Sequence, residues 1–325
     1  MNDTPVHRLR SDGLEMEVQT RGAALTGLWL RDKPHSLVLR FADGCDHLRV
    51  PIYAGVLVGP VANRIRQGMV RVGGRCFQMP CNENGQTALH SGPEGLHVQE
   101  WAVLQKSHDV LTLKCLLPDG LGGLPGNREI TASYRLAGQT FALTVTATTD
   151  ATTPINIAAH PYWNLDGLGD IATHRLQVMA GAYLPVHDLN LPTGEIASVS
   201  GTRFDFQNAR PLTHDPALDV NFCLSRVPQA APRPAARLLG RDGTTLEIAT
   251  TAPGLQVYGG AHLPHQPAAL ETGGDLKPFG AIALEPQFWP DAPAHPEFPS
   301  ILLHPGQTWR QATIYRLSCS EFPGI

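Results

Sequence analysis

Glycine and proline recur at short intervals along the whole chain, and this punctuation constrains the fold more than any other feature. The 325 residues include 32 glycines and 28 prolines, and both residue types interrupt helices and mark turns. Few long stretches between them show the 3.6-residue period of an amphipathic helix. The pattern predicts many strands joined by turns.

One predicted strand is especially clear. Thr140–Thr149 reads TFALTVTATT, which places Phe141, Leu143 and Val145 on one face and mostly threonines on the other. This period of two indicates a half-buried strand, and threonine suits the exposed face of a sheet. Residues 128–136 read REITASYRL, and Ala137-Gly138-Gln139 joins them to this strand in a predicted hairpin.

Two further dipeptides predict tight hairpin turns. Gly73-Gly74 lies within residues 70–79, and Asp242-Gly243 within residues 237–250; both pairs favour two-residue turns. Residues 307–317 are expected to form the last strand. The proline-rich residues 227–234 fit a long surface loop or, alternatively, a linker. We predict one all-β domain over residues 1–325, a large antiparallel β-sandwich.

Composition narrows the functional classes. Hydrophobic residues make up 42% and charged residues 17% of the chain, which is typical of a chain with a substantial core. A net charge of -4 without a basic run disfavours a nucleic-acid partner. No apolar run approaches the ~18–20 residues that span a bilayer.

Cysteine usage and the N-terminus bear on location. The six cysteines, at positions 45, 76, 81, 115, 223 and 319, form no CxxC pair, and their spacing fits free thiols of a reducing compartment. The polar N-terminus lacks the apolar core of a signal peptide. The expectation is a cytoplasmic protein.

Glu285 and His160 are the strongest catalytic candidates. Glu285 ends a short apolar run and precedes two aromatic residues in ALEPQFWPD, and His160 lies in the apolar tract NIAAHPYWNL. The neutral imidazole is favoured there unless a carboxylate lies nearby. One carboxylate and one imidazole beside aromatic rings suit proton transfer on a neutral, hydroxyl-rich substrate.

Four other polar residues stand between predicted strands, and each has a purely structural alternative. Asn63 and Arg64 form a solvated loop pair or bind several oxygens at once; His90 is a structural histidine or a ligand-binding one; Asp219 caps a turn or holds a hydroxyl. His262 and His265 form HxxH but lack a third ligand at convincing spacing. No phosphate-binding loop, dinucleotide fingerprint or GxSxG motif is present, so neither cofactor nor metal is predicted.

Taken together, these segments resemble the aldose 1-epimerase (galactose mutarotase) family from about residue 10 to residue 318. Family members read ANRI, LHGG, NHSYFNL, FDF, DHNF, a QFYTG-like strand, LETQ with PDA, and PG before an aromatic residue. In the same order this chain reads ANRIRQG, LHSG, AAHPYWNL, FDF, DVNF, LQVYGG, LEPQFWPDAPAHPEFPS and PGQTW. The resemblance implies the galactose mutarotase-like supersandwich fold and a cofactor-independent isomerase of a monosaccharide.

The resemblance also implies roles for single residues. His160 matches the family's general acid and Glu285 its general base. The residues that match segments lining the family's sugar pocket are Asn63, Arg64, His90, Asp219 and Gln256.

The chain departs from the family pattern at several positions, which are Pro60, Ser91, Ala159, Val220 and Pro286. None of them is a proposed proton carrier. They put the preferred sugar in doubt more than the reaction.

The implied mechanism opens an aldopyranose to its aldehyde and closes it on the other carbonyl face. Glu285 would remove the anomeric proton, and His160 would protonate the ring oxygen. In this scheme a bell-shaped pH dependence is expected, with the acid limb from Glu285 and the alkaline limb from His160. Trp163, Phe288 or Trp289 would stack on the sugar or simply pack in the core.

Three alternatives stay open. A hexose-phosphate mutarotase would need further cations at the pocket, for which Arg66, Arg71 and Arg203 are candidates. A non-catalytic sugar-binding protein would have no use for a paired acid and base. A glycosidase usually needs two carboxylates that flank the bond. The sequence leaves open the preferred aldose and whether the protein is a monomer or a homodimer.

Overall fold

The computed structural model describes residues 4–44, 46–167 and 169–319. Its regular secondary structure is almost entirely β-strand, with one four-residue helix, α1 (Asp46–Arg49), and a few single turns of 3₁₀ helix in the described residues. Every pair of named strands in this part of the chain is antiparallel, and Cys45 falls outside it. The predicted all-β class with large antiparallel sheets is confirmed.

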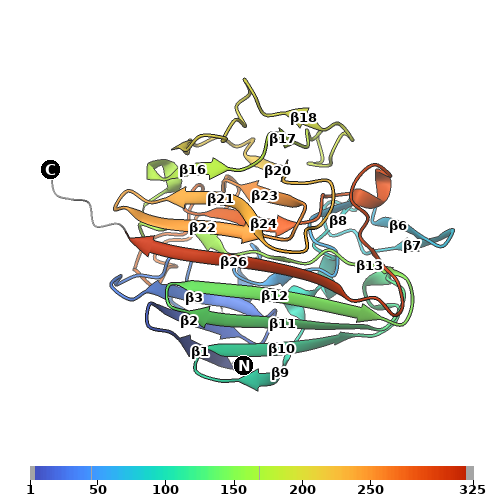
Figure 1. The fold of residues 1–325 in the computed structure, drawn as a ribbon, viewed down its shortest axis with the longest axis horizontal. Coiled ribbons are helices and arrows are strands. Elements are labelled where there is room, and N and C mark those ends of the chain that lie inside the picture. The colour runs from blue at the N-terminus through green and yellow to red at the C-terminus, as the bar shows by residue number, and fades with distance from the viewer. Residues whose placement is uncertain (1–3, 45, 168, 320–325) are drawn as a thin grey trace.

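A nine-stranded sheet extends across the whole molecule (Figure 1). Its strands, in spatial order, are β19 (Arg210–Pro211), β16 (Arg175–Val178), β21 (Arg233–Leu239), β22 (Thr244–Thr250), β26 (Trp309–Cys319), β12 (Thr140–Thr149), β11 (Arg128–Ala137), β10 (Val110–Leu117) and β9 (Ala102–Lys106).

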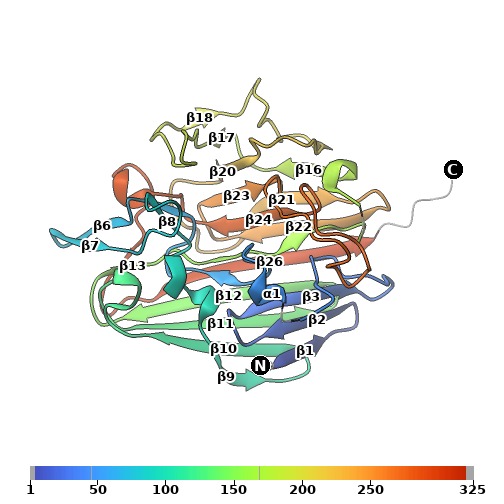
Figure 2. The ribbon, with the colours of Figure 1, turned by 180° about the vertical axis from the view of Figure 1, so that it is seen from behind.

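Two further sheets lie behind this one, and Figure 2 shows them from their own side. The six-stranded sheet has the order β15 (Tyr162–Trp163), β24 (Ile282–Gln287), β23 (Gly254–Tyr258), β20 (Asp219–Cys223), β17 (Ala182–Tyr183) and β18 (Ala197–Ser198). The three-stranded sheet has the order β1 (Val6–Arg10), β2 (Leu14–Gln19) and β3 (Ala24–Leu30).

Short two-stranded ribbons complete the fold. They pair β4 (Leu57–Val58) with β14 (Ala158–Ala159), β5 (Arg64–Arg66) with β8 (Thr87–Leu89), β6 (Met69–Val72) with β7 (Arg75–Gln78), and β13 (Thr153–Pro154) with β25 (Leu302–Leu303).

The main hydrophobic core takes residues from all three large sheets. Met16 comes from β2, Val145 from β12 and Leu284 from β24, and all three are at least 97% buried. Since each sheet contributes alternate residues to this core, the layered arrangement buries one face of every long strand.

The predicted hairpins are borne out in the main. Ala137 pairs with Thr140 across Gly138-Gln139, and Val72 pairs with Arg75 across Gly73-Gly74. Both Gly73 and Gly74 have positive φ, of 55° and 80°, as a type I′ turn requires. The last strand, expected at 307–317, is β26, which starts and ends two residues later.

The predicted two-residue turn at Asp242-Gly243 is wrong, although the hairpin exists. The amide of Gly240 donates to the carbonyl of Thr244 at 2.8 Å, so three residues lie between them. The Asp242 carboxylate accepts the Thr244 amide at 2.9 Å, and Gly243 takes a φ of 86°. A three-residue loop with glycine in the left-handed position is the next common hairpin solution.

Residues 227–232 lie in the surface connection between β20 and β21, and residues 233 and 234 begin β21. This is the surface loop rather than the linker. Within the described residues no helix has the length and apolar character needed to span a membrane.

Candidate active site

One cavity of about 420 Å³ brings together all seven residues predicted as catalytic or sugar-binding. Its lining draws on segments from Pro51 to Glu285. The seven candidates in it are Asn63, Arg64, His90, His160, Asp219, Gln256 and Glu285.

Strand alternation places three of them on one face of the six-stranded sheet. Gln256 of β23 lies opposite Glu285 of β24, and Asp219 of β20 lies opposite Tyr258 of β23. The residues between them on these strands, such as Val257 and Leu284, point into the main core and are fully buried. The sheet therefore presents its polar residues to the cavity and its apolar residues to the core.

His160 is held by its backbone between two strands. Its amide donates to the carbonyl of Val56 at 3.0 Å, and its carbonyl accepts the amide of Gly55 at 2.9 Å. The imidazole packs beside the rings of Tyr162 and His90, at centroid distances of 5.0 and 5.5 Å. These contacts fix the ring against the cavity wall.

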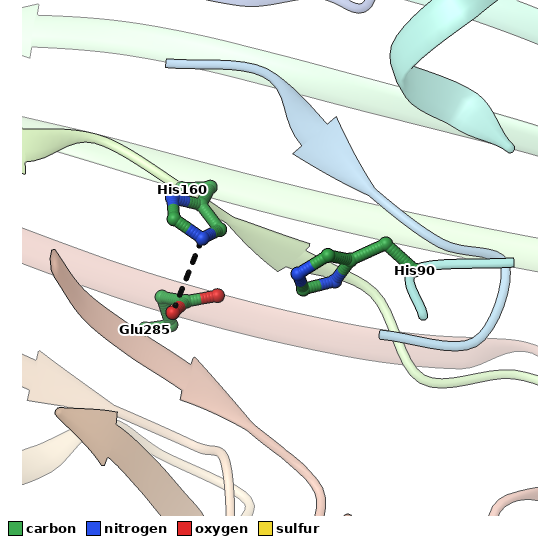
Figure 3. Close-up of side chains that lie close together, drawn as sticks. All are labelled: His90, His160 and Glu285. Atoms are coloured by element: carbon green, nitrogen blue, oxygen red, sulfur yellow. Dashed lines mark ion pairs between the residues drawn. The ribbon is translucent and has the colours of Figure 1, made fainter. Parts of the chain in front are cut away.

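His160 and Glu285 face each other (Figure 3), with 3.5 Å between His160 Nε2 and Glu285 Oε1. Their side chains are only 6% and 3% exposed. In the described part of the chain neither His160 Nδ1 nor Glu285 Oε2 has a hydrogen-bond partner. Two buried ionisable groups with unused polar atoms are typical of a site that completes its hydrogen bonds with a ligand.

Burial favours the uncharged form of both groups. It raises the pKa of Glu285 well above its usual value, an effect that the Asp219 carboxylate reinforces and Arg64 opposes. Burial lowers the pKa of His160 to about 4. The directions of these shifts reverse the order expected from the sequence, in which Glu285 gave the acid limb and His160 the alkaline limb.

His90 is locked as a neutral hydrogen-bond donor. Its Nδ1 accepts the backbone amide of Asn63 at 3.1 Å, so the proton resides on Nε2. Burial, followed by the nearby His160 and Arg64, lowers the pKa of His90 well below its usual value. The ring can therefore donate one hydrogen bond to a ligand oxygen.

This tautomer bears on metal binding. The ligand atoms of His90, His160 and Glu285 lie within 4.8 Å of one another, close enough to share an ion. Metal ligation needs a free lone pair on each imidazole. In His90 the Nδ1 lone pair is occupied by Asn63 and Nε2 carries the proton, so this set of donors is unsuited to a metal.

Arg64 is the centre of a polar cluster that also lines the cavity. Its Nε and NH2 donate to both carboxylate oxygens of Glu83, at 2.8 and 2.9 Å. Its NH1 lies 3.8 Å from Asp219 Oδ2, and Gln256 Nε2 donates to Asp219 Oδ1 at 2.6 Å. A planar guanidinium fixed on two sides in this way presents its remaining N–H groups in a defined direction.

Backbone strain gathers at this cavity. Tyr53, Asn63 and His90 all line it and have φ of 61°, 62° and 53°. The left-handed region is unfavourable for residues other than glycine, especially bulky ones, and such outliers cluster at functional sites. The paired strands β5 and β8 fix the ends of two of these residues and hold the strained geometry.

The aromatic residues of the cavity differ from those considered in the sequence. Trp163, Phe288 and Trp289 are 0%, 4% and 1% exposed and pack in hydrophobic clusters, so their role is core packing. Aromatic residues that line the cavity are Tyr53, Tyr162 and Tyr258. Tyr162 could have been found, because it lies two residues after His160 and so shares its face of an extended segment.

Most of the further residues considered from the sequence lie away from the cavity lining. Arg203 pairs with Asp215 and Arg66 with Asp291, and Arg71 lies on the β6–β7 ribbon. His262 lines the cavity, but His265 faces Asp275 at 3.7 Å instead. Glu83, the bidentate partner of Arg64, was missed because a loop carboxylate next to Asn-Gly gives no distinguishing pattern.

Comparisons with known proteins show the family of this chain. The family model described as aldose 1-epimerase matches residues 5–316. The chain is 35% identical over 324 residues to galactose mutarotase of Rattus norvegicus, covering 96% of this chain and 93% of that protein. It is 32% identical over 279 residues to aldose 1-epimerase of Escherichia coli K12, covering 81% and 80%.

Solved structures show the same fold. The aldose epimerase homologue from C. elegans superposes with a TM-score of 0.90 at 28% identity, covering 98% of this chain and all of that one. Galactose 1-epimerase from Lactobacillus acidophilus gives a TM-score of 0.81 at 25% identity, covering 99% and 93%.

The chain belongs to the aldose 1-epimerase family. The predicted family, the predicted sandwich fold and the predicted isomerase class are confirmed.

Proposed function

We propose that this protein interconverts the α and β anomers of a free aldose, with His160 and Glu285 as its proton carriers. The observation that carries the proposal is the buried 3.5 Å pairing of these two side chains at the wall of a polar cavity. The isomerase requires no redox change, because the substrate and product differ only in configuration at one carbon.

The two proton transfers balance within the site. Glu285 takes the proton of the anomeric hydroxyl while the bond between the anomeric carbon and the ring oxygen breaks, and the ring oxygen takes a proton from His160. This gives the open aldehyde. Rotation about the bond between the first two carbons presents the other carbonyl face, and closure returns both protons.

In its active form the His160–Glu285 pair carries one exchangeable proton beyond the N–H of the neutral imidazole. Burial favours this proton on Glu285, whereas catalysis in the direction described needs it on His160. Transfer across the 3.5 Å gap from Oε1 to Nε2 interconverts the two forms without a change in total charge. Apparent pKa values from kinetics therefore belong to the pair rather than to either residue.

The remaining candidates are proposed to hold the hydroxyls that do not react. Arg64 NH1, Gln256 Nε2 and His90 Nε2 act as donors, while the Asp219 carboxylate accepts. Asn63 Oδ1 already accepts the Arg64 amide at 2.8 Å, so its side chain contributes its NH₂ group. Fixed distal hydroxyls keep the reacting oxygens in place while the aldehyde rotates.

The charge of the cavity disfavours a phosphorylated sugar. Three carboxylates line it, those of Glu83, Asp219 and Glu285, and among the described lining residues Arg64 is the single arginine or lysine. Arg64 is itself engaged by Glu83. A dianionic phosphate would meet net repulsion there.

Polarimetry of freshly dissolved α-D-galactose and α-D-glucose tests the function. The relatives named galactose mutarotase make D-galactose the first aldose to assay. Acceleration of both rotations with little effect on glucose 6-phosphate supports the proposal. Acceleration with the phosphate alone contradicts it, and so does sugar binding in calorimetry without any acceleration.

We expect a bell-shaped dependence of kcat/KM on pH. Activity falls on the acid side, near the pKa of about 4 for His160, as the pair takes up a second proton. It falls on the alkaline side well above the usual glutamic acid pKa, as Glu285 loses the last proton. Initial rates across the pH range check this, and an acid limb without an alkaline limb would contradict the shared proton.

Arg64→Lys should weaken sugar binding more than turnover. Lysine cannot reproduce the two-pronged contact with Glu83 and also face Asp219. Hydrogen bonds to charged groups contribute ~1.5–3 kcal/mol, so KM is expected to rise about 10- to 100-fold with a smaller change in kcat. Arg71→Lys, on the ribbon outside the cavity, is the matched control and should retain the parental KM.

We further propose that residues 1–325 act as one domain and that the protein is cytoplasmic. The main core supports the first point because it draws on residues from Leu9 to Leu317. Free thiols support the second, at Cys76, Cys81, Cys115, Cys223 and Cys319.

A further inference from the structure

Gln311 is a polar residue on the core-facing side of a strand. It lies on β26 opposite Val145 of β12, on the face of the nine-stranded sheet that Tyr315 and Leu317 turn toward the core. Its side chain is buried, with 6% of the residue exposed. A buried amide costs free energy unless its hydrogen bonds are made.

The side-chain NH₂ of Gln311 bridges the two segments that carry the proton pair. It donates to the carbonyl of Pro286 at 2.9 Å and to the carbonyl of Ile157 at 3.2 Å. Pro286 directly follows Glu285, and Ile157 lies three residues before His160. One nitrogen with two hydrogens thus satisfies both carbonyls at once.

Strand pairing alone ties these two segments together only weakly. β14 pairs with β4, and β24 pairs with β15 only at Ala283 and Ile282. Beyond Ala283 the partner of β24 is β23, which carries neither proton carrier. The Asn156 side chain adds two hydrogen bonds to Phe288: its Oδ1 accepts the amide at 2.9 Å, and its Nδ2 donates to the carbonyl at 3.4 Å.

The side-chain carbonyl oxygen of Gln311 supports a positioning role. Its Oε1 is buried and has no partner among the described residues, a cost that an apolar side chain would avoid. General stability of the core therefore does not explain a glutamine here. The two hydrogen bonds that its NH₂ group donates to Pro286 and Ile157 explain it.

We propose that Gln311 is a positioning residue that sets the separation between His160 and Glu285. This inference rests on the proposed function, in which those two groups exchange protons with one sugar. Without the bridge, the Ile157 and Pro286 carbonyls lose their shared donor and the two segments are free to move apart.

Gln311→Met tests the inference, since methionine has a similar length and no donor. Because a displacement of ~1 Å can cost ~10²-fold, kcat for mutarotation should fall about 10- to 100-fold, with KM nearly unchanged. The two limbs of the kcat/KM profile should also move closer together, because a longer distance weakens the Glu285–His160 interaction that favours the one-proton form of the pair over its doubly protonated and unprotonated forms.

Thr313→Val is the matched control. Thr313 lies on the same face of β26, two residues along, and its hydroxyl pairs with Thr250 Oγ1 at 3.0 Å rather than with either site segment. It should keep the parental kcat and the parental pH profile. If Gln311→Met does not fold, Gln311→Asn, which keeps the NH₂ but is one methylene shorter, replaces it with the same expectation.

The outcomes separate the two proposals. A folded Gln311 variant with parental kcat and an unmoved pH profile overturns the positioning role, and so does an equal loss in Thr313→Val. A parent protein that fails to accelerate mutarotation of any aldose overturns the proposed function instead.

Discussion

Glu285→Gln is expected to lose most of the mutarotase activity while remaining folded. The amide keeps the size of the side chain but cannot take the anomeric proton, and loss of a general base costs about 10²- to 10⁴-fold in rate. Its neighbours on β23 and β24 hold the strand in place regardless of the side-chain charge. Polarimetry with saturating galactose measures the fall in kcat.

The same change should stabilise the protein, by an amount that depends on pH. Burial holds the folded pKa of Glu285 above the ordinary value of 4.5. As the pH rises past that ordinary value, the unfolded chain ionises first, so the parent loses stability until the folded pKa is reached. Glutamine does not titrate there, and its advantage in melting temperature should grow as the pH rises past 4.5 and level off once the raised pKa of folded Glu285 is passed.

Glu247→Gln provides the control for both measurements. Glu247 lies on β22, where its side chain is 49% exposed and faces Arg237. It should leave kcat unchanged, and because no carboxylate is buried at this position, the stabilisation expected of Glu285→Gln should be missing. Parental activity in Glu285→Gln would remove the carboxylate from the mechanism, whatever the stability data show.

The free-energy cost of burying a carboxylate is also the reason why the site could be predicted from the sequence. A carboxylate that ends an apolar run is costly in a core, so the segment ALEPQFW indicates Glu285 from the sequence alone. His160 stood out for the same reason. The long strand Thr140–Thr149 could be predicted equally well from its alternating sequence, because one of its faces is buried along its length.

Features that depend on tertiary contacts could not be predicted from the sequence. The Asp242-Gly243 turn gained a residue because the Asp242 side chain captures the Thr244 amide. Glu83 and Tyr53 reach the cavity from loops without periodicity, and the left-handed backbone of Tyr53 is held by its surroundings. The adjacent aromatics Phe288 and Trp289 gave no indication that both would turn into the core.

The pKa order of the proton pair also required the structure. The sequence placed His160 near aromatic rings, but only the fold shows that both groups are almost completely buried and 3.5 Å apart. Because burial disfavours charge on each, the pair shares one proton rather than holding a permanent ion pair. This makes the residual activity of single variants informative about which group holds the proton.

His160→Asn is expected to lower kcat by about 10²- to 10⁴-fold, the usual contribution of one general acid. The backbone bonds of His160 to Val56 and Gly55 do not involve its side chain, so the segment should keep its course. Far-ultraviolet circular dichroism checks that the variant is folded. His265→Asn, whose parental side chain is 63% exposed and outside the cavity lining, should retain full activity.

The pH profile of the weak residual activity gives the sharper test. With the imidazole gone, Glu285 remains as the sole base, and it works only when ionised. The bell should become a single rise with increasing pH, centred well above the usual glutamic acid pKa because the carboxyl stays buried. A residual bell with both parental limbs would mean that another group, such as His90, supplies the proton to the ring oxygen, and the assignment of His160 would then be wrong.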